Sequence, residues 1–142
     1  MKEPNTIKIS ANLSSVDVGY IDILIQKGIS SSRTDFLHYA AKKEIDNHHS
    51  DLQKIIAEDS QEIMIDGHSA DGFEVLIGRY DIDDAFLASL SQKRSVTNYY
   101  VIGQLHFNNI HDEDRLFKVI KSIKIFGKLY ANDSIYNHYV GK

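Results

Sequence analysis

Three hydrogen-bonding side chains occupy alternate positions near the start of the chain. Lys8, Ser10 and Asn12 are separated by Ile9 and Ala11, so an extended strand would point the three polar groups to one face. Lysine donates, an amide donates and accepts, and a serine hydroxyl does either. This face therefore has the chemistry to bind other hydrogen-bonding groups, and an ordinary solvated strand face is the alternative interpretation.

A second polar group, Ser31, Ser32 and Arg33, precedes an apolar run with helical spacing. The stretch from Ser32 to Asp35 has the spacing of a helix cap, so Ser32 is expected to cap this helix. The free N–H groups and the positive dipole end of such a helix start attract an anion. Arg33 adds a positive charge. A plain surface cap is the alternative, and the sequence does not distinguish Ser31 from Ser32 as the residue that would contact the anion.

The histidines raise the question of metal chemistry. The candidates are His48, His49, His68, His106 and His111, with carboxylates at Asp66, Asp71, Asp112 and Glu113. The chain has no cysteine, which excludes disulfides, thiolate ligands and cysteine nucleophiles. Surface histidines beside loop carboxylates are the favoured interpretation, so we predict no metal site and no cofactor. A Gly-rich phosphate loop and a Gly-x-Ser-x-Gly motif are both missing from the sequence, and we predict that the protein is not an enzyme.

The polar groups need elements to position them. Residues 6–13 alternate in the way of a strand with one buried face, and one strand is not stable alone. The next segment reads as a helix that starts at Ser14 and stops at Gly28, so the expected partner is the same strand of a second chain. A second helix carries apolar residues on one face. It either runs on past Leu52 or breaks near His48 and restarts.

The pattern changes after Asp59. Strands are predicted at 62–66, 73–80, 98–107 and 122–131, with short helices at 82–93 and 112–121. Three tetrapeptides share the order apolar, Gly, long polar, apolar, and their glycines are Gly78, Gly103 and Gly127. Spacings of 25 and 24 residues are typical of stacked β units.

The net charge of −4 is unevenly divided. Residues 1–49 hold six Lys/Arg and six Asp/Glu, so residues 50–142 carry the whole deficit. An N-terminal region without a strong basic field would bind a polyanion through a few well-placed groups, with a shallow dependence on salt. No apolar run approaches the roughly 20 residues needed to cross a bilayer, and the first ten residues lack the apolar stretch of a secretory signal. We expect a cytoplasmic protein that does not bind membranes.

Strand, capped helix, glycine turn and capped helix, all within residues 6–47, resemble the ribbon-helix-helix regulators of the MetJ/Arc/CopG type. The matching residues are Ile7, Ile9, Leu13, Val18, Ile21, Leu24, Ile25, Gly28, Ser32, Arg33, Thr34, Asp35, Phe36, Leu37, Ala40 and Ile45. Ser14 after the strand and Gly19 inside the first helix depart from the usual pattern, and neither removes the fold. The resemblance implies an α+β protein. It would have an intertwined ribbon-helix-helix dimer at residues 1–49, a helical linker at 50–60 and a smaller β-rich α+β domain at 61–142.

The resemblance also implies a function, a DNA-binding transcriptional repressor that is autoregulatory. Its two-stranded ribbon would enter the major groove of double-stranded DNA, with Lys8, Ser10 and Asn12 contacting bases. Ser31, Ser32 and Arg33 would contact phosphates. The C-terminal domain is expected to join dimers into tetramers. Alternatives are an antitoxin with a toxin partner, a metal- or ligand-responsive regulator, and a scaffold or filament former built on the repeat. A basic cluster at Lys118, Lys121, Lys124 and Lys128 either touches DNA or is a solvated face.

Overall fold

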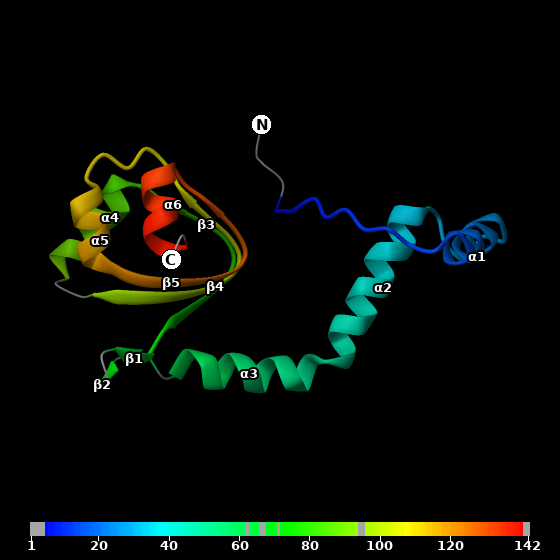
Figure 1. Ribbon diagram of the computed structural model, residues 1–142, viewed down its shortest axis with the longest axis horizontal. Coiled ribbons are helices and arrows are strands. Elements are labelled where there is room, and N and C mark those ends of the chain that lie inside the picture. The colour runs from blue at the N-terminus through cyan, green and yellow to red at the C-terminus, as the bar shows by residue number, and fades with distance from the viewer. Residues whose placement is uncertain (1–4, 62, 66–67, 71, 94–95, 141–142) are drawn as a thin grey trace. The chain divides into compact units, whose positions relative to one another are not determined.

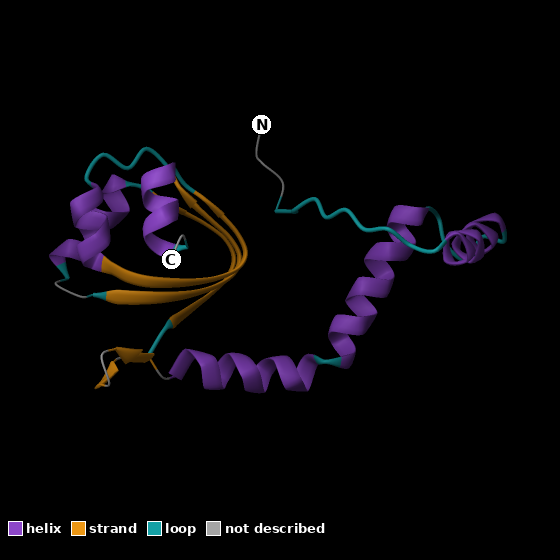
Figure 2. Cartoon of the chain, viewed as in Figure 1, coloured by secondary structure: helices purple, strands orange, loops and turns teal. Residues whose placement is uncertain are grey.

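The computed structural model describes residues 5–61, 63–65, 68–70, 72–93 and 96–140, and side chains are described outside residues 62–71. The chain is an α+β protein with two compact units (Figures 1 and 2). The N-terminal unit is residues 8–57, and the C-terminal unit is residues 1–7 with 58–142. The expectation of a smaller C-terminal domain is wrong, because residues 58–142 alone outnumber residues 8–57 of the N-terminal unit.

Helices α1 (Ser15–Gln26) and α2 (Arg33–Asn47) form the N-terminal unit together with most of α3 (His49–Gln61). The Ser14 hydroxyl accepts from the Asp17 backbone N–H at 3.1 Å and caps α1, as the sequence predicts. Gly28 has φ +76° and follows the helix at the position where a left-handed residue ends it. The expected helix, glycine turn and helix are therefore present.

The predicted second helix breaks rather than running on. The residue between α2 and α3 is His48, whose imidazole lies 3.0 Å from a Glu44 carboxylate oxygen and 3.5 Å from an Asp51 oxygen. Its backbone N–H donates to the Ile45 carbonyl at 3.0 Å. The helix that starts at His49 then continues to Gln61.

The C-terminal unit begins with an antiparallel pair, β1 (Ile63–Ile65) and β2 (His68–Ala70). Three strand–helix repeats follow: β3 (Glu74–Ile82) with α4 (Asp84–Gln92), β4 (Thr97–Phe107) with α5 (Glu113–Val119), and β5 (Ile120–Tyr130) with α6 (Asp133–Tyr139). The strands are parallel, in the order β3-β4-β5. The three strands, α4 and α5 lie close to their predicted positions, whereas no helix was predicted at the position of α6.

The glycine repeat is a structural repeat. Gly78 pairs with Gly103 and Gly103 with Gly127 across the sheet, with φ of +119°, +132° and +125°. An added Cβ would lie 2.2 Å from the Gly78 carbonyl oxygen at Gly103, and 1.9 Å from the Gly103 oxygen at Gly127. Only glycine fits such positions. The sheet curves around α6, with the helices on its concave side (Figure 2).

The core of the C-terminal unit lies between this concave face and the helices. Side chains from strands and helices both contribute: Ile82, Leu87, Tyr99, Val101, Leu105, Phe107, Leu116, Ile120, Ile123, Leu129 and Ile135. Alternation along β4 therefore places Asn98, Tyr100, Gln104 and His106 on the opposite face. We call this the outer face of the sheet.

Candidate nucleic-acid interface

The segment with the predicted base-contacting residues belongs to no helix or strand and pairs with none of the strands in the described part of the chain. Lys8, Ser10 and Asn12 are exposed, and so are Ile7 and Ile9 on the other side of the alternation. Ile9 is 84% exposed. The predicted strand is thus absent from one chain, because a strand requires a partner for its backbone groups. The ribbon of two chains stays a prediction.

The helices after this segment have no core of their own. Ile21 is the one buried residue between residues 5 and 57, a stretch that the structure describes in full. Large apolar side chains of the three helices are exposed: Val16, Tyr20, Ile23, Leu37, Tyr39, Ile45, Leu52 and Ile55. Exposed apolar surface on this scale marks an interaction surface.

The start of α2 brings the predicted phosphate-contacting residues together. The Ser32 hydroxyl accepts from the Asp35 backbone N–H at 3.0 Å, which makes it the cap that the spacing predicts. The Ser31 hydroxyl donates to the Asp35 carboxylate. Ser31 is exposed and Ser32 is half-buried. The two serines therefore differ in role: Ser32 satisfies the helix end, while Ser31 presents its hydroxyl at the surface.

Arg33 binds a carboxylate of the preceding helix. Its guanidinium donates to both oxygens of Asp22, at 2.9 and 2.8 Å. The hydrogen bond from Arg33 is the main reason why the pKa of Asp22 lies below its usual value. Sequence reasoning missed Asp22, because a partner eleven residues away in another helix follows no local spacing rule. This pair orients Arg33 beside the α2 N-terminus, and a phosphate would compete with Asp22 for it.

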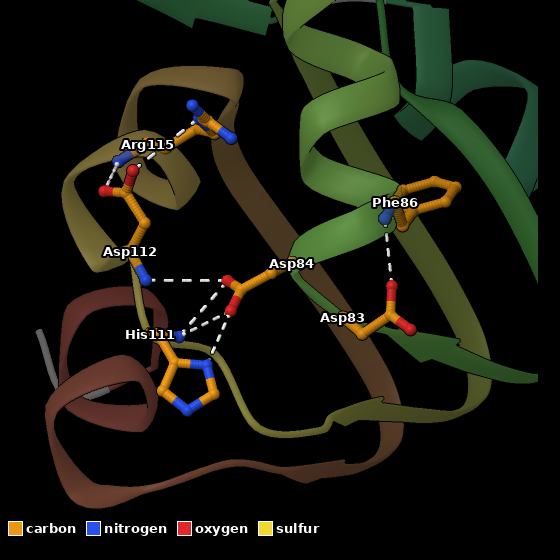
Figure 3. A network of polar contacts seen from close by, with 6 residues as sticks. All are labelled: Asp83, Asp84, Phe86, His111, Asp112 and Arg115. Carbon is orange, nitrogen blue, oxygen red and sulfur yellow. Dashed lines mark hydrogen bonds and ion pairs between the residues drawn. The ribbon is translucent and has the colours of Figure 1, made fainter.

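Two of the candidate histidines, His106 and His111, contact other groups of the protein. Figure 3 shows the Asp84 carboxylate facing His111, whose Nδ1 lies 2.8 Å from it and whose backbone N–H donates at 3.0 Å. These hydrogen bonds, the side-chain one first, hold the pKa of Asp84 below its usual value. The network joins the starts of α4 and α5. His106 stacks on Tyr130 with ring centroids 4.2 Å apart.

Among the side chains that the structure describes, no three metal-binding groups converge. His68, Asp66 and Asp71 lie outside them. The lysines of the basic cluster are exposed on α5 and β5. Lys124 and Lys128 lie over the rings of Phe73 and Tyr130, at 5.2 and 4.9 Å.

An alternating segment followed by two capped helices is the chain order of proteins that bind DNA with a two-stranded ribbon. A model of the Ribbon-Helix-Helix transcriptional regulator family matches residues 4–136, so the chain belongs to that family. Regulators of this family bind DNA and typically form dimers. No curated protein and no solved structure matches the chain. None of the helices in the described part is long and apolar enough to span a membrane.

Proposed function

We propose that the protein is a sequence-specific repressor that binds its own upstream DNA as a dimer, through an intersubunit β-ribbon. The observation that carries the proposal is the uncovered N-terminal unit, with one buried residue between residues 5 and 57. A second copy would supply both the missing strand partner and the missing apolar contacts.

The ribbon would expose one polar face to the major groove. Lys8 would donate to guanine O6 or N7, Asn12 would pair with adenine, and Ser10 would donate or accept. The α2 start would bind a phosphate through its backbone N–H groups, with Ser31 and Arg33 adding side-chain contacts and Ser32 shaping the turn. The region carries few basic residues, so the dimer would gain from binding adjacent sites cooperatively. We assign the joining of dimers into tetramers to the C-terminal unit.

Two alternatives are less well supported. Antitoxin tails are often disordered until they bind, whereas this C-terminal unit has a core of its own, which argues against an antitoxin. A metal-responsive regulator requires ligands that converge, and the described His111 and His106 each contact other protein groups instead.

The test is binding of the full chain to duplexes from the region upstream of its own gene. Lys8→Ala with Asn12→Ala should remove discrimination, worth about 1–3 kcal/mol per bidentate contact, and leave the dimer intact. Arg33→Ala should weaken binding to all sequences alike. It should also reduce the slope of the logarithm of the binding constant against the logarithm of the salt concentration by about 1. Lys42→Ala, an exposed change on α2, is the matched control. Retained specificity in the double variant would exclude the ribbon as the reading surface.

A further inference from the structure

The outer face of β4 is buried although α4, α5 and α6 lie on the concave side of the sheet. Tyr100 is 3% exposed and Gln104 is 4% exposed. Both side chains alternate with the core residues of β4 and so point away from the helices. Segments from outside the sheet contribute to this burial, and two of them are identified by hydrogen bonds.

The first contact holds the end of α3. The Tyr100 hydroxyl donates to the Asp59 carboxylate at 3.1 Å. The Tyr100 ring packs between Phe73 and Phe126, with centroids 6.2 and 5.1 Å away. Burial, and then the bond to Asp59, raise the pKa of Tyr100. A tyrosine hydroxyl is protonated at neutral pH even without this shift, so it is a donor here.

The second contact holds the segment before the predicted ribbon. The Gln104 side-chain Nε2 donates to the Thr6 carbonyl at 3.3 Å. The Gln104 Oε1 lies 2.9 Å from His106 Nε2, and the His106 ring stacks on Tyr130. The amide of Gln104 is thus oriented by a buried neighbour so that its donor faces Thr6.

Thr6 and Asp59 belong to the C-terminal unit and lie close to the two points where the chain passes into and out of the N-terminal unit. The chain enters that unit after Ile7 and leaves it before Glu58. Tyr100 and Gln104 are four residues apart on one strand, or about 13 Å at the usual rise per residue. Within the C-terminal unit, one strand therefore binds a residue close to each of these two points.

We propose that Tyr100 and Gln104 are positioning residues for DNA recognition, because they bind to β4 the two chain segments that lead into and out of the DNA-binding unit. This inference rests on the proposed function. The predicted ribbon strand begins at Thr6, the residue that Gln104 binds. Holding the Thr6 and Asp59 segments reduces the number of conformations that these segments lose when the ribbon binds DNA. A unit with few phosphate contacts depends strongly on such preorganisation.

The test compares Tyr100→Phe, Gln104→Met and the double variant of the full chain with the wild type. Tyr100→Phe removes the hydroxyl and keeps the ring, and Gln104→Met removes the donor at similar length. Tyr80→Phe is the matched control, because the Tyr80 hydroxyl donates to the Ile77 carbonyl of its own strand at 3.3 Å. Amide hydrogen exchange reports on residues 6–8 and 58–60, and titration with an upstream duplex reports on affinity.

Exchange should accelerate at residues 58–60 in Tyr100→Phe and at residues 6–8 in Gln104→Met. Each variant should bind the duplex about three- to tenfold more weakly, the range expected for one lost hydrogen bond. The salt slope should stay the same because the phosphate contacts are unchanged, and Tyr80→Phe should match the wild type. Unchanged affinity in the double variant overturns the inference, and so does an equal loss in Tyr80→Phe. Wild-type protein that ignores the DNA overturns the proposed function, and this inference with it.

Discussion

The two units of the molecule bury their apolar residues to different extents. The C-terminal unit packs eleven buried side chains into one cluster, whereas Ile21 alone is buried between residues 5 and 57. Burial of apolar surface is the main stabilising contribution to folding. One unit is thus complete within a single chain, and the other leaves its apolar face uncovered.

This difference has a functional consequence. All the residues that we assign to DNA contacts lie in the unit without a core, so their arrangement would depend on a second copy. Dimer formation and DNA reading would then be one coupled equilibrium. The C-terminal unit has a core of its own, and its strand β4 binds Thr6 and Asp59, which belong to the same unit.

The largest effect is expected from Gly127→Ala in the C-terminal unit. The new Cβ would lie 1.9 Å from the Gly103 carbonyl oxygen, at a backbone φ of +125°. Backbone strain and the clash together should cost about 3–5 kcal/mol of unfolding free energy. Thermal and denaturant unfolding followed by circular dichroism would measure this loss.

Gly19→Ala in α1 is the matched control, since nothing lies within 4 Å of the added Cβ. A glycine inside a helix costs about 1 kcal/mol relative to alanine, so this variant should gain stability. Equal losses in the two variants would contradict the view that the close approach of the Gly103 backbone restricts position 127 to glycine.

The local features of this fold were predictable from the sequence. Ser14 and Ser32 cap helices where their spacing predicts, because a cap depends on residues within one turn. The glycine repeat predicted stacked units, and Gly78, Gly103 and Gly127 pair across the sheet. In each case the information lies in a few neighbouring residues or in a period along the chain.

Contacts between distant residues were not predictable. Asp22 with Arg33, Asp84 with His111 and Gln104 with Thr6 join positions that no spacing rule relates. The parallel order of the strands was also missed, because alternation does not specify which strand lies beside which. The ribbon residues Lys8, Ser10 and Asn12 remain predictions for a different reason: their partner is a second chain.

The next largest effect concerns the uncovered unit. Ile9 is 84% exposed in one chain. If a second copy covers it, Ile9→Ala should lower the unfolding free energy by about 2–5 kcal/mol per buried side chain. The unfolding temperature of the N-terminal unit should rise with protein concentration, because association stabilises the folded form. Calorimetry at low and high concentration would show this.

Ile77→Ala on β3 is the control for this change, with the residue 67% exposed in the unit that has its own core. This variant should lose no more than about 0.5 kcal/mol of unfolding free energy, which is usual for surface substitutions. An Ile9→Ala cost as small as this, with no dependence on concentration, would mean that the N-terminal unit does not require a second copy.

The smallest effect is a loss of stability of the C-terminal unit in alkali. Burial, and then the charge of Glu74, raise the pKa of Tyr99 to about 12, and burial raises the pKa of Tyr139 as well. An unfolded chain ionises its tyrosines near pH 10, so the folded form binds more protons between pH 10 and 12. The stabilisation is complete below pH 10 and is lost as the pH rises through this window.

Tyr99 should account for about 1 kcal/mol of this loss near pH 11. Denaturant unfolding at a series of pH values would measure it, with the ultraviolet absorbance of ionised tyrosine recorded in parallel. Tyr99→Phe removes one ionising group and should flatten the decline above pH 10, whatever its effect at neutral pH. A decline that Tyr99→Phe does not alter would show that the core of the C-terminal unit admits water to this side chain.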